Sequence, residues 1–219
     1  MNVVIFGASG MVGQGVLREC LLDPEVKRVV TVGRTSSGQQ HPKVRDLVHA
    51  DLFDLTALEP ELTGLDGCFF CLGVSAAGMS EGAYSRVTYD LTISVAEMLL
   101  RLSPGMTFLY VSGAGTDSTE RGRTMWARVK GRTENALLRM PFKAAYMFRP
   151  AGIRPLHGIR SKTKLYQTFY TLLRPVLPLM TRLFPSFMTT TEQLGRAMLN
   201  VVKRGERSRV IEAAEINKL

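Results

Sequence analysis

The chain has 219 residues, 45% of them hydrophobic, and carries 28 Lys and Arg against 19 Asp and Glu, a formal net charge of +9. This length predicts one domain with a sizeable core. No basic segment followed by an apolar core precedes the first predicted strand, and the charge-poor stretches are too short to span a membrane, so we expect a cytoplasmic protein.

The charge is divided unevenly along the chain. Residues 1–120 hold 8 basic and 14 acidic residues, net −6, whereas residues 121–219 hold 20 and 5, net +15. Such asymmetry indicates an anionic partner for the basic part, either a phosphorylated ligand, an acidic lipid surface or nucleic acid; the alternative is a solvated basic surface. No recognised nucleic-acid-binding module accompanies the charge, which argues against nucleic acid as the partner.

Apolar runs alternate with helical patterns along most of the chain. The first strand is predicted at residues 2–6, whose consecutive apolar residues suit a strand buried on both faces. The other predicted strands span residues 28–33, 44–48, 67–72, 106–111, 143–148 and 208–212, and the predicted helices span 11–22, 54–60, 81–102, 122–140 and Thr190 through Val202. This alternation predicts an α/β fold, a Rossmann-type doubly wound parallel sheet with helices on both faces.

A glycine-rich segment joins the first predicted strand to the first predicted helix. Its spacing, Gly7-x-x-Gly10-x-x-Gly13, lets the backbone turn sharply and approach a pyrophosphate that faces the helix N-terminus. A strand before it and helical spacing after it are the context that this motif requires. We therefore predict that a dinucleotide contacts Gly7, Ser9, Gly10, Met11, Val12 and Gly13.

The end of the second predicted strand indicates which dinucleotide binds. Sites for NAD place an Asp or Glu about twenty residues beyond the glycines, but here the strand ends in Arg34-Thr35-Ser36 and the next acid is Asp46. A guanidinium pairs with a 2′-phosphate that a carboxylate would repel. Arg34, helped by the Thr35 and Ser36 hydroxyls, predicts NADP(H) rather than NAD; the other interpretation is that Arg34 is a solvated strand end.

The three cysteines, Cys20, Cys68 and Cys71, indicate a reducing compartment without a disulfide framework. Cys68 and Cys71 have the C-x-x-C spacing of redox and zinc sites, but residues three apart on a strand face opposite sides of the sheet. We interpret both as core residues. His41 and His49 add nothing that resembles a metal cluster, so no metal site is predicted.

Further motifs extend over nearly the whole chain, at residues 65–67, 71–75, 111–115, 129–134 and 148–152. With the glycine spacing, they resemble the extended or atypical short-chain dehydrogenase/reductase superfamily, and are most similar to the HIV Tat-interacting protein family and to bacterial NAD-dependent epimerase/dehydratase-like relatives. The resemblance implies one NAD(P)-binding domain over residues 1–219. By motif it adds Asp51, Leu52, Leu72, Gly73, Ser75, Lys130, Arg149 and Pro150 to the cofactor site.

The catalytic residues of that superfamily are only partly present. The resemblance implies a Tyr and a Lys four residues apart on a helix, with a Ser after the fifth strand, but here Trp126 precedes Lys130. An indole N–H donates a hydrogen bond but does not ionise near neutral pH. Lys130 and Ser112 remain as the catalytic candidates, Gly113 stands at the usual second serine, and Tyr84 and His157 are substitute proton donors. Trp126 either packs in the core or forms a pocket wall.

Two functions are therefore open. In one, the protein is a reductase or epimerase that acts on an unidentified small molecule with a non-standard proton donor. In the other, it is a dinucleotide-binding regulator or assembly factor whose basic C-terminal third binds a partner or a membrane surface.

Residues 151–190 are predicted to cover the nicotinamide end of the cleft as a substrate lid. Basic residues are interleaved there with large apolar ones, a mixture that also suits a peripheral membrane contact, a subunit interface or burial against the domain's own core. A lid that also packs on its own domain is favoured, because large apolar side chains need cover in a soluble protein. The residues concerned are Arg160, Lys162, Lys164, Arg174 and Arg182, with Leu165, Phe169, Leu172, Leu177 and Phe184.

Overall fold

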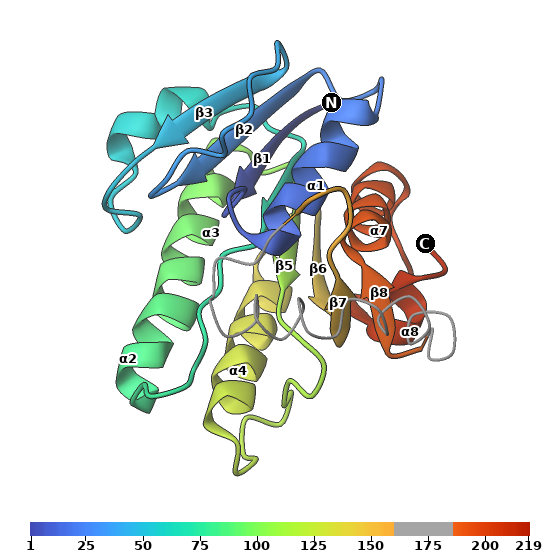
Figure 1. The fold of residues 1–219 in the computed structure, drawn as a ribbon. Helices are drawn as coiled ribbons and strands as arrows, with labels where there is room; N and C mark the ends of the chain where they lie inside the picture. Colours follow the sequence, from blue (N-terminus) through green and yellow to red (C-terminus); the bar gives the residue numbers. More distant parts are fainter. Residues whose placement is uncertain (160–185) are drawn as a thin grey trace.

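The computed structural model describes residues 1–159 and 186–219 (Figure 1). Its strands are β1 (Asn2–Phe6), β2 (Arg28–Gly33), β3 (Val44–Val48), β4 (Gly67–Phe70), β5 (Thr107–Val111), β6 (Ala144–Arg149), β7 (Gly152–Arg154), β8 (Met188–Thr190) and β9 (Val210–Glu212). Its helices are α1 (Met11–Leu22), the 3₁₀ helix η1 (Thr56–Glu61), α2 (Glu81–Ser85), the π-helical turn η2 (Arg86–Asp90), α3 (Leu91–Leu102), α4 (Met125–Arg139), α7 (Thr191–Arg204) and α8 (Ala213–Ile216).

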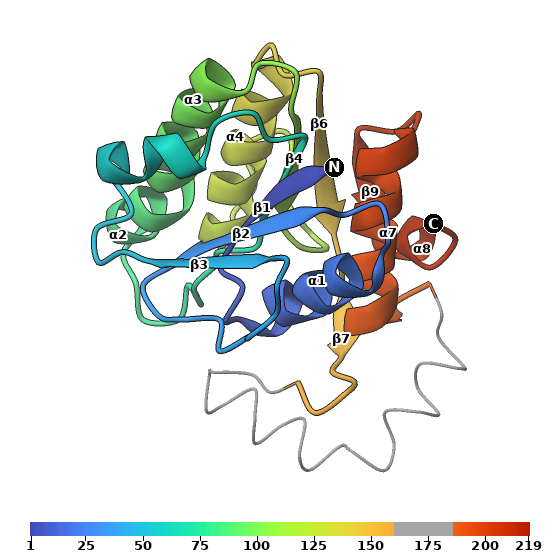
Figure 2. The same cartoon turned by 90° about the horizontal axis from the view of Figure 1, so that it is seen from above.

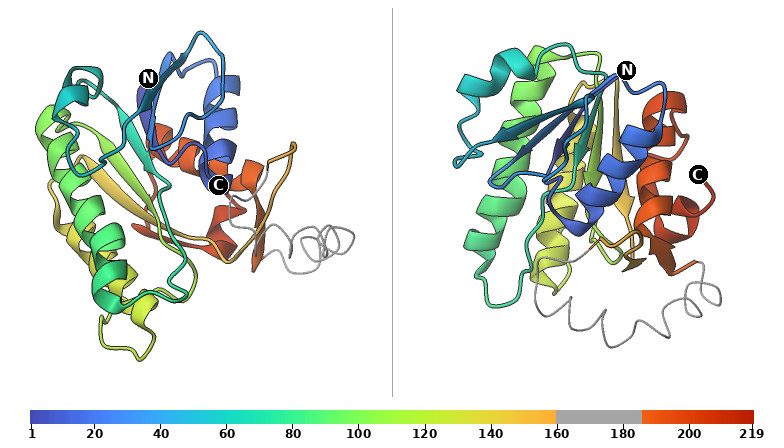
Figure 3. Two further views of the ribbon diagram at one scale, coloured as in Figure 1. Left: turned by 60° about the vertical axis from the view of Figure 1, so that its left-hand side comes forward. Right: turned by 45° about the horizontal axis from the view of Figure 1, so that its top comes forward.

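Seven strands form one parallel sheet in the order β3-β2-β1-β4-β5-β6-β9. Seen from above in Figure 2, α3 and α4 cover one face of this sheet and α1 and α7 cover the other. Figure 3 shows the same two helical layers from the side. The predicted doubly wound Rossmann-type fold is confirmed.

Alternate residues of each central strand enter opposite cores, because successive strand side chains point to opposite faces of the sheet. Val4 and Phe6 of β1 pack under α3 and α4, whereas Val3 and Ile5 pack under α1 and α7. The same alternation separates the cysteines: Cys68 lies in the first core and Cys71 packs against the second.

The helix α1 is seated tightly on α7. A Cβ atom on Gly15 would lie 2.5 Å from the carbonyl oxygen of Thr191, and one on Gly195 would lie 2.8 Å from the carbonyl oxygen of Gly15. Glycines at this crossing therefore let the two helix backbones touch. This contact fixes the orientation of α1, whose N-terminus faces the ends of β1 and β4.

Several element boundaries differ from the predictions. The helix predicted at 81–102 contains the π-helical turn η2, and the segment predicted at 54–60 is the 3₁₀ helix η1, which includes Pro60. The helix predicted from residue 122 begins at Met125, because the Asp117 carboxylate accepts hydrogen bonds from the backbone N–H of Gly122 (2.6 Å) and from Thr119 and holds that segment in a turn.

The predicted lid lies mostly outside the described residues. Within 151–190, the structure describes residues 151–159 and 186–190, where β7 and β8 pair in parallel as a small second sheet that the sequence did not predict. A Cβ atom on Gly152 would lie 2.1 Å from the Met188 sulfur, so the pairing depends on glycine at that position. The interleaved basic and apolar residues of 160–184 fall in the part that is not described.

Candidate functional site

A cleft of about 770 Å³ opens at the carboxyl ends of the central strands. It lies where the chain crosses from β3 back to β4 beside β1, the switch point at which ligands bind in open α/β sheets. The lining residues are Gly7, Ser9, Gly10, Met11, Val12, Gly33, Arg34, Thr35, Cys71, Leu72, Gly73, Val111, Ser112, Lys130, Pro150, Ala151 and Ile153. Eleven of these were predicted as site residues from the sequence, and the fold brings them to one place.

The glycine turn shapes one wall of the cleft. Gly7 has a φ of +83°, a conformation that favours glycine. A Cβ atom on Gly13 would lie only 2.2 Å from the Gly7 carbonyl oxygen, so glycine at this position lets α1 pack closely against the turn. Gly13 does not itself line the cleft. Gly10 caps α1 without a side-chain acceptor, and the first turn of α1 holds no acidic residue. The positive end of this helix is therefore open to an anion.

Arg34 stands at the mouth of the cleft, directly after β2, and is exposed. No described carboxylate forms an ion pair with it. The next residue is tied to the glycine turn, since the hydroxyls of Thr35 and Ser9 are 3.1 Å apart. The Ser36 hydroxyl donates a hydrogen bond to the Asp46 carboxylate (2.6 Å). It is therefore not available to donate to a 2′-phosphate, the role that the sequence had predicted for it.

Lys130 and Ser112 form the opposite wall. The Lys130 ammonium, on α4, donates a hydrogen bond to the Ser112 carbonyl oxygen. Burial lowers the pKa of Lys130 to about 8, against the opposing effect of the Glu134 carboxylate one helical turn further on. Among the described lining residues, Lys130 is the one whose pKa is moved toward neutral pH, whereas burial raises the pKa of Cys71 to about 12.

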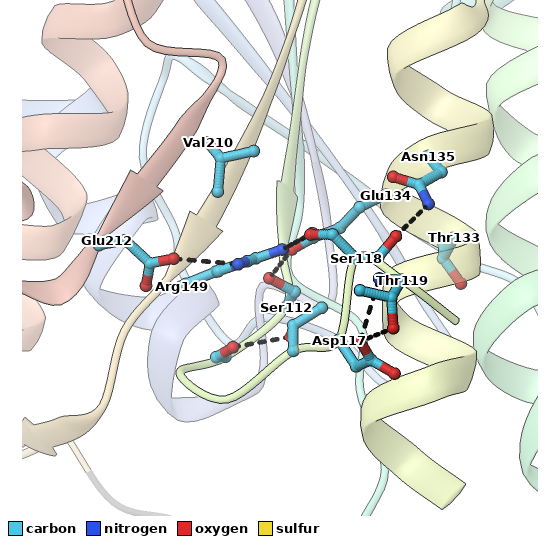
Figure 4. A network of polar contacts seen from close by, with 12 residues as sticks. Ser112, Asp117, Ser118, Thr119, Thr133, Glu134, Asn135, Arg149, Val210 and Glu212 are labelled. Carbon is cyan, nitrogen blue, oxygen red and sulfur yellow. Dashed lines mark hydrogen bonds and ion pairs between the residues drawn. The ribbon is translucent and has the colours of Figure 1, made fainter. Parts of the chain in front are cut away.

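Beneath Ser112 lies a buried ion-pair network, shown in Figure 4. The Arg149 guanidinium donates from both Nε and Nη2 to the Glu134 carboxylate and from Nη1 to Glu212 (3.0 Å). Its Nη2 also reaches the Ser118 hydroxyl at 2.6 Å. Glu134 is 1% exposed and Arg149 8%, so these charges neutralise each other away from water.

The Ser112 hydroxyl belongs to the same network. It lies within hydrogen-bond distance of the Glu134 carboxylate and, at 3.1 Å, of the Phe148 carbonyl oxygen. Both partners only accept, so the single hydroxyl proton goes to one of them. Ser112 can accept a hydrogen bond from a bound molecule, but it donates inward.

Four residues assigned to the cofactor by motif lie outside the cleft lining. Arg149 is held by Glu134, as described above. Leu52 is buried and faces a separate small cavity beside α3. Asp51 is exposed and accepts the backbone N–H of Phe53, and Ser75 is exposed and accepts the backbone N–H of Ala77. The cofactor roles of these four residues remain predictions.

The substitute proton donors do not reach the cleft. Tyr84 is 2% exposed, and burial raises the pKa of its hydroxyl. His157 lines a second pocket, beside α1, where its Nε2 lies 2.6 Å from a Glu192 carboxylate oxygen. Trp126 is neither fully buried nor part of the cleft lining; a Cβ atom on Gly115 would lie 3.5 Å from its indole ring.

Residues 1–159 and 186–219 give no support to a redox site or a metal site. The three cysteines are free, and burial raises the pKa of each thiol. No group of His, Cys, Asp or Glu in these segments is arranged to hold a metal ion. No helix within the described residues is both long enough and apolar enough to cross a bilayer.

Sequence reasoning missed two kinds of site residue. Gly33, Val111, Ala151 and Ile153 also line the cleft, but they have no charged or polar side chain that could mark them in the sequence. Glu134 could have been found from the sequence, because it follows Lys130 by four residues and both side chains therefore lie on one side of α4. Its buried partner, Arg149, lies on a strand that only the fold brings near.

Comparison with known proteins gives this chain relatives in sequence and in fold. The chain is 26% identical over 159 residues to "Protein fmp52, mitochondrial" of Emericella nidulans and 28% identical over 152 residues to Protein HTATIP2 of Rattus norvegicus. These matches cover 69% and 68% of this chain but 66% and 61% of the relatives, so the chain spans less than two thirds of their length.

Solved structures share the fold at low sequence identity. The Helicobacter pylori ADP-L-glycero-D-manno-heptose-6-epimerase superposes with a TM-score of 0.70 at 15% identity, over 96% of this chain and 76% of that one. The Bordetella bronchiseptica enzyme WbmF, in complex with NAD⁺ and UDP, gives 0.70 at 16% identity, over 97% and 71%. Residues 3–124, more than half of the chain, match the model of the NAD dependent epimerase/dehydratase family, and the chain therefore belongs to that family.

Proposed function

We propose that this protein binds NADP(H) in the cleft, with the pyrophosphate on the N-terminus of α1 and the 2′-phosphate on Arg34. One observation carries the proposal: two positive groups face the same cleft, and neither is neutralised by a described carboxylate. They are the N-terminus of α1, whose first turn holds no acidic residue, and the Arg34 guanidinium. An anion with two separated phosphate groups complements both.

The lining residues fit such a ligand. Gly7 and Gly10 leave backbone free to approach a pyrophosphate, and Lys130 lies on the opposite wall, where its ammonium can reach ribose hydroxyls. When bound, NADPH supplies a hydride. The chain's own residues supply the binding charges, and Lys130 supplies a group able to gain or lose a proton near neutral pH.

Calorimetric titration of NADPH and NADH tests the assignment. A charge-assisted phosphate contact is worth about 1.5–3 kcal/mol, so NADPH is expected to bind about tenfold or more tightly than NADH. Arg34→Ala should remove this preference. Arg121→Ala is the matched control, because Arg121 is exposed and does not line the cleft. Equal affinities for the two cofactors, or a preference that Arg34→Ala leaves intact, would overturn the assignment.

We further propose that tyrosine-dependent hydride transfer is weak. Trp126 stands where the short-chain dehydrogenases have their tyrosine and cannot exchange a proton with an alkoxide. Ser112 donates its proton inward to the network under the cleft. A reductase or epimerase built on this chain therefore acts on its small-molecule substrate with a non-standard proton donor.

Restoring the tyrosine tests this second step. A positioned acid or base contributes about 100- to 10,000-fold. Residue 126 lies one turn of α4 before Lys130 but outside the described cleft lining, so Trp126→Tyr is expected to raise slow NADPH oxidation with aldehydes, ketones or quinones by less than this range. Lys130→Ala in that background should abolish the gain. Robust turnover by the unmodified protein that survives Lys130→Ala would show that the active site lies elsewhere.

The same observations favour a second candidate, a regulator or assembly factor that binds the dinucleotide without turning it over. Here the basic C-terminal third provides the surface for a partner or an anionic membrane. Co-sedimentation with anionic and with neutral vesicles at low and moderate salt tests the membrane form: binding to anionic vesicles alone, lost as salt rises, supports it. A cytoplasmic location also remains a proposal, tested by fractionation, since the fmp52 relatives carry the word mitochondrial in their names.

A further inference from the structure

The turn that follows β2 is held in place by one carboxylate. Asp46, on β3, pairs across the sheet with Thr31 of β2, so its side chain lies beside the end of that strand. One carboxylate oxygen accepts the Thr31 hydroxyl. The other accepts the Ser36 hydroxyl (2.6 Å), the Ser37 backbone N–H (2.9 Å) and the Ser37 hydroxyl (3.1 Å).

These four hydrogen bonds occupy the acceptor sites of the Asp46 carboxylate. Burial raises the pKa of this carboxyl, but the hydrogen bonds from Ser36, Thr31 and Ser37 outweigh it and hold the pKa below its ordinary value. Asp46 is thus ionised at neutral pH, and its acceptor sites are turned toward the turn. It does not line the cleft.

The turn is anchored on its other side as well, where the hydroxyls of Thr35 and Ser9 meet. Arg34 precedes Thr35 directly, so its backbone is fixed between β2 and a segment tied both to the glycine turn and to Asp46. The long side chain of Arg34 has no described ion-pair partner to orient it, and its position depends on the backbone that carries it.

We propose that Asp46 is a positioning residue for cofactor selection: by holding the 34–37 turn it places Arg34 where a 2′-phosphate binds. The inference rests on the proposed function. Its consequence is counterintuitive, since Asp46 is a negative charge close to a site for an anion. A simple electrostatic effect predicts that removing this charge strengthens NADPH binding, whereas a positioning role predicts that it weakens NADPH binding.

Asp46→Asn separates these two effects, because an amide has one acceptor oxygen and an NH₂ group that cannot accept the donors of the turn. We expect the Kd for NADPH to rise about three- to tenfold and the Kd for NADH to change less than about twofold. In a double-mutant cycle, Asp46→Asn should add nothing for NADPH once Arg34 is alanine. The paired variant Ser36→Ala with Ser37→Ala removes two hydroxyl donors of the turn instead of the acceptor, leaves the Ser37 backbone N–H in place, and should lower the preference for NADPH.

Asp66→Asn is the matched control. Its carboxylate accepts the Asn2 backbone N–H (2.6 Å) at the far end of the sheet, so the same charge and a similar hydrogen bond are lost away from the cleft. Stronger NADPH binding in Asp46→Asn, or equal losses for both cofactors, overturns the positioning role while leaving the proposed function intact. A wild-type protein without any preference for NADPH overturns the proposed function itself.

Discussion

The two walls of the cleft handle charge in opposite ways. On the wall formed by β1, α1 and the end of β2, the helix N-terminus and Arg34 face the cleft, and neither has a carboxylate partner among the described residues. On the wall formed by β5, α4 and β6, the Glu134 carboxylate is engaged by Arg149 and lies within reach of the Ser112 hydroxyl. One wall presents its charges to a ligand, and the other satisfies them internally.

This difference separates the groups suited to bind an anion from the groups able to exchange a proton. A positive group without a carboxylate partner is stabilised when an anion binds to it, so the first wall is suited to hold a phosphorylated ligand. A buried, saturated network is rigid and offers few groups for proton exchange. Lys130 is the exception on the second wall, because it lines the cleft and its pKa is lowered to about 8.

Breaking the internal network should have the largest effect. Glu134→Gln leaves the Arg149 guanidinium buried with a neutral partner that accepts with only one oxygen. Removing one partner of a buried ion pair costs about 3–5 kcal/mol, so the unfolding free energy should fall by roughly that amount in a denaturant titration. The Ser112 hydroxyl should keep the Phe148 carbonyl oxygen, at 3.1 Å, as an acceptor in this variant.

Glu212→Gln is the control for that change, because Glu212 contacts the same guanidinium but its side chain is 50% exposed. Exposed ion pairs contribute about 0–1 kcal/mol, so this variant should lose about 1 kcal/mol or less. Similar losses in the two variants would contradict the distinction between a buried and an exposed partner.

The lowered pKa of Lys130 predicts a dependence of stability on pH. Between about 8 and its ordinary value of 10.5, the unfolded chain keeps a proton on this amine that the folded chain has released. Stability contributed by this group therefore rises with pH across that window, by at most about 1.4 kcal/mol per pH unit. The measured quantity is the unfolding free energy of the wild type minus that of Lys130→Met at each pH, which removes the contribution of the other titrating groups. A flat or falling difference would show that the ammonium is not desolvated.

The sequence predicted the open wall better than the paired wall for a physical reason. The glycine spacing and Arg34 act through their neighbours in the chain, so their positions follow from one strand and the residues after it. The Arg149 network joins α4, β6 and β9, which lie far apart in sequence. Ser36 shows the same limit: its acceptor, Asp46, comes from the adjacent strand ten residues on, so its proton could not be assigned from the sequence.

The smallest expected effect concerns Cys71, which lines the open side of the cleft. Burial raises the pKa of this thiol from its ordinary value of 9.0 to about 12, so the reactive thiolate is much scarcer than in the unfolded chain. Iodoacetamide at pH 8 should leave Cys71 unlabelled in the native protein while labelling all three cysteines in denaturant, as read by peptide mass spectrometry. At pH 10 slow labelling of Cys71 should appear first, ahead of the fully buried Cys20 and Cys68, and NADPH should slow it by covering the cleft. Native Cys71 that reacts at the unfolded rate at pH 8 would show that burial does not raise the pKa of this thiol, and would contradict the prediction.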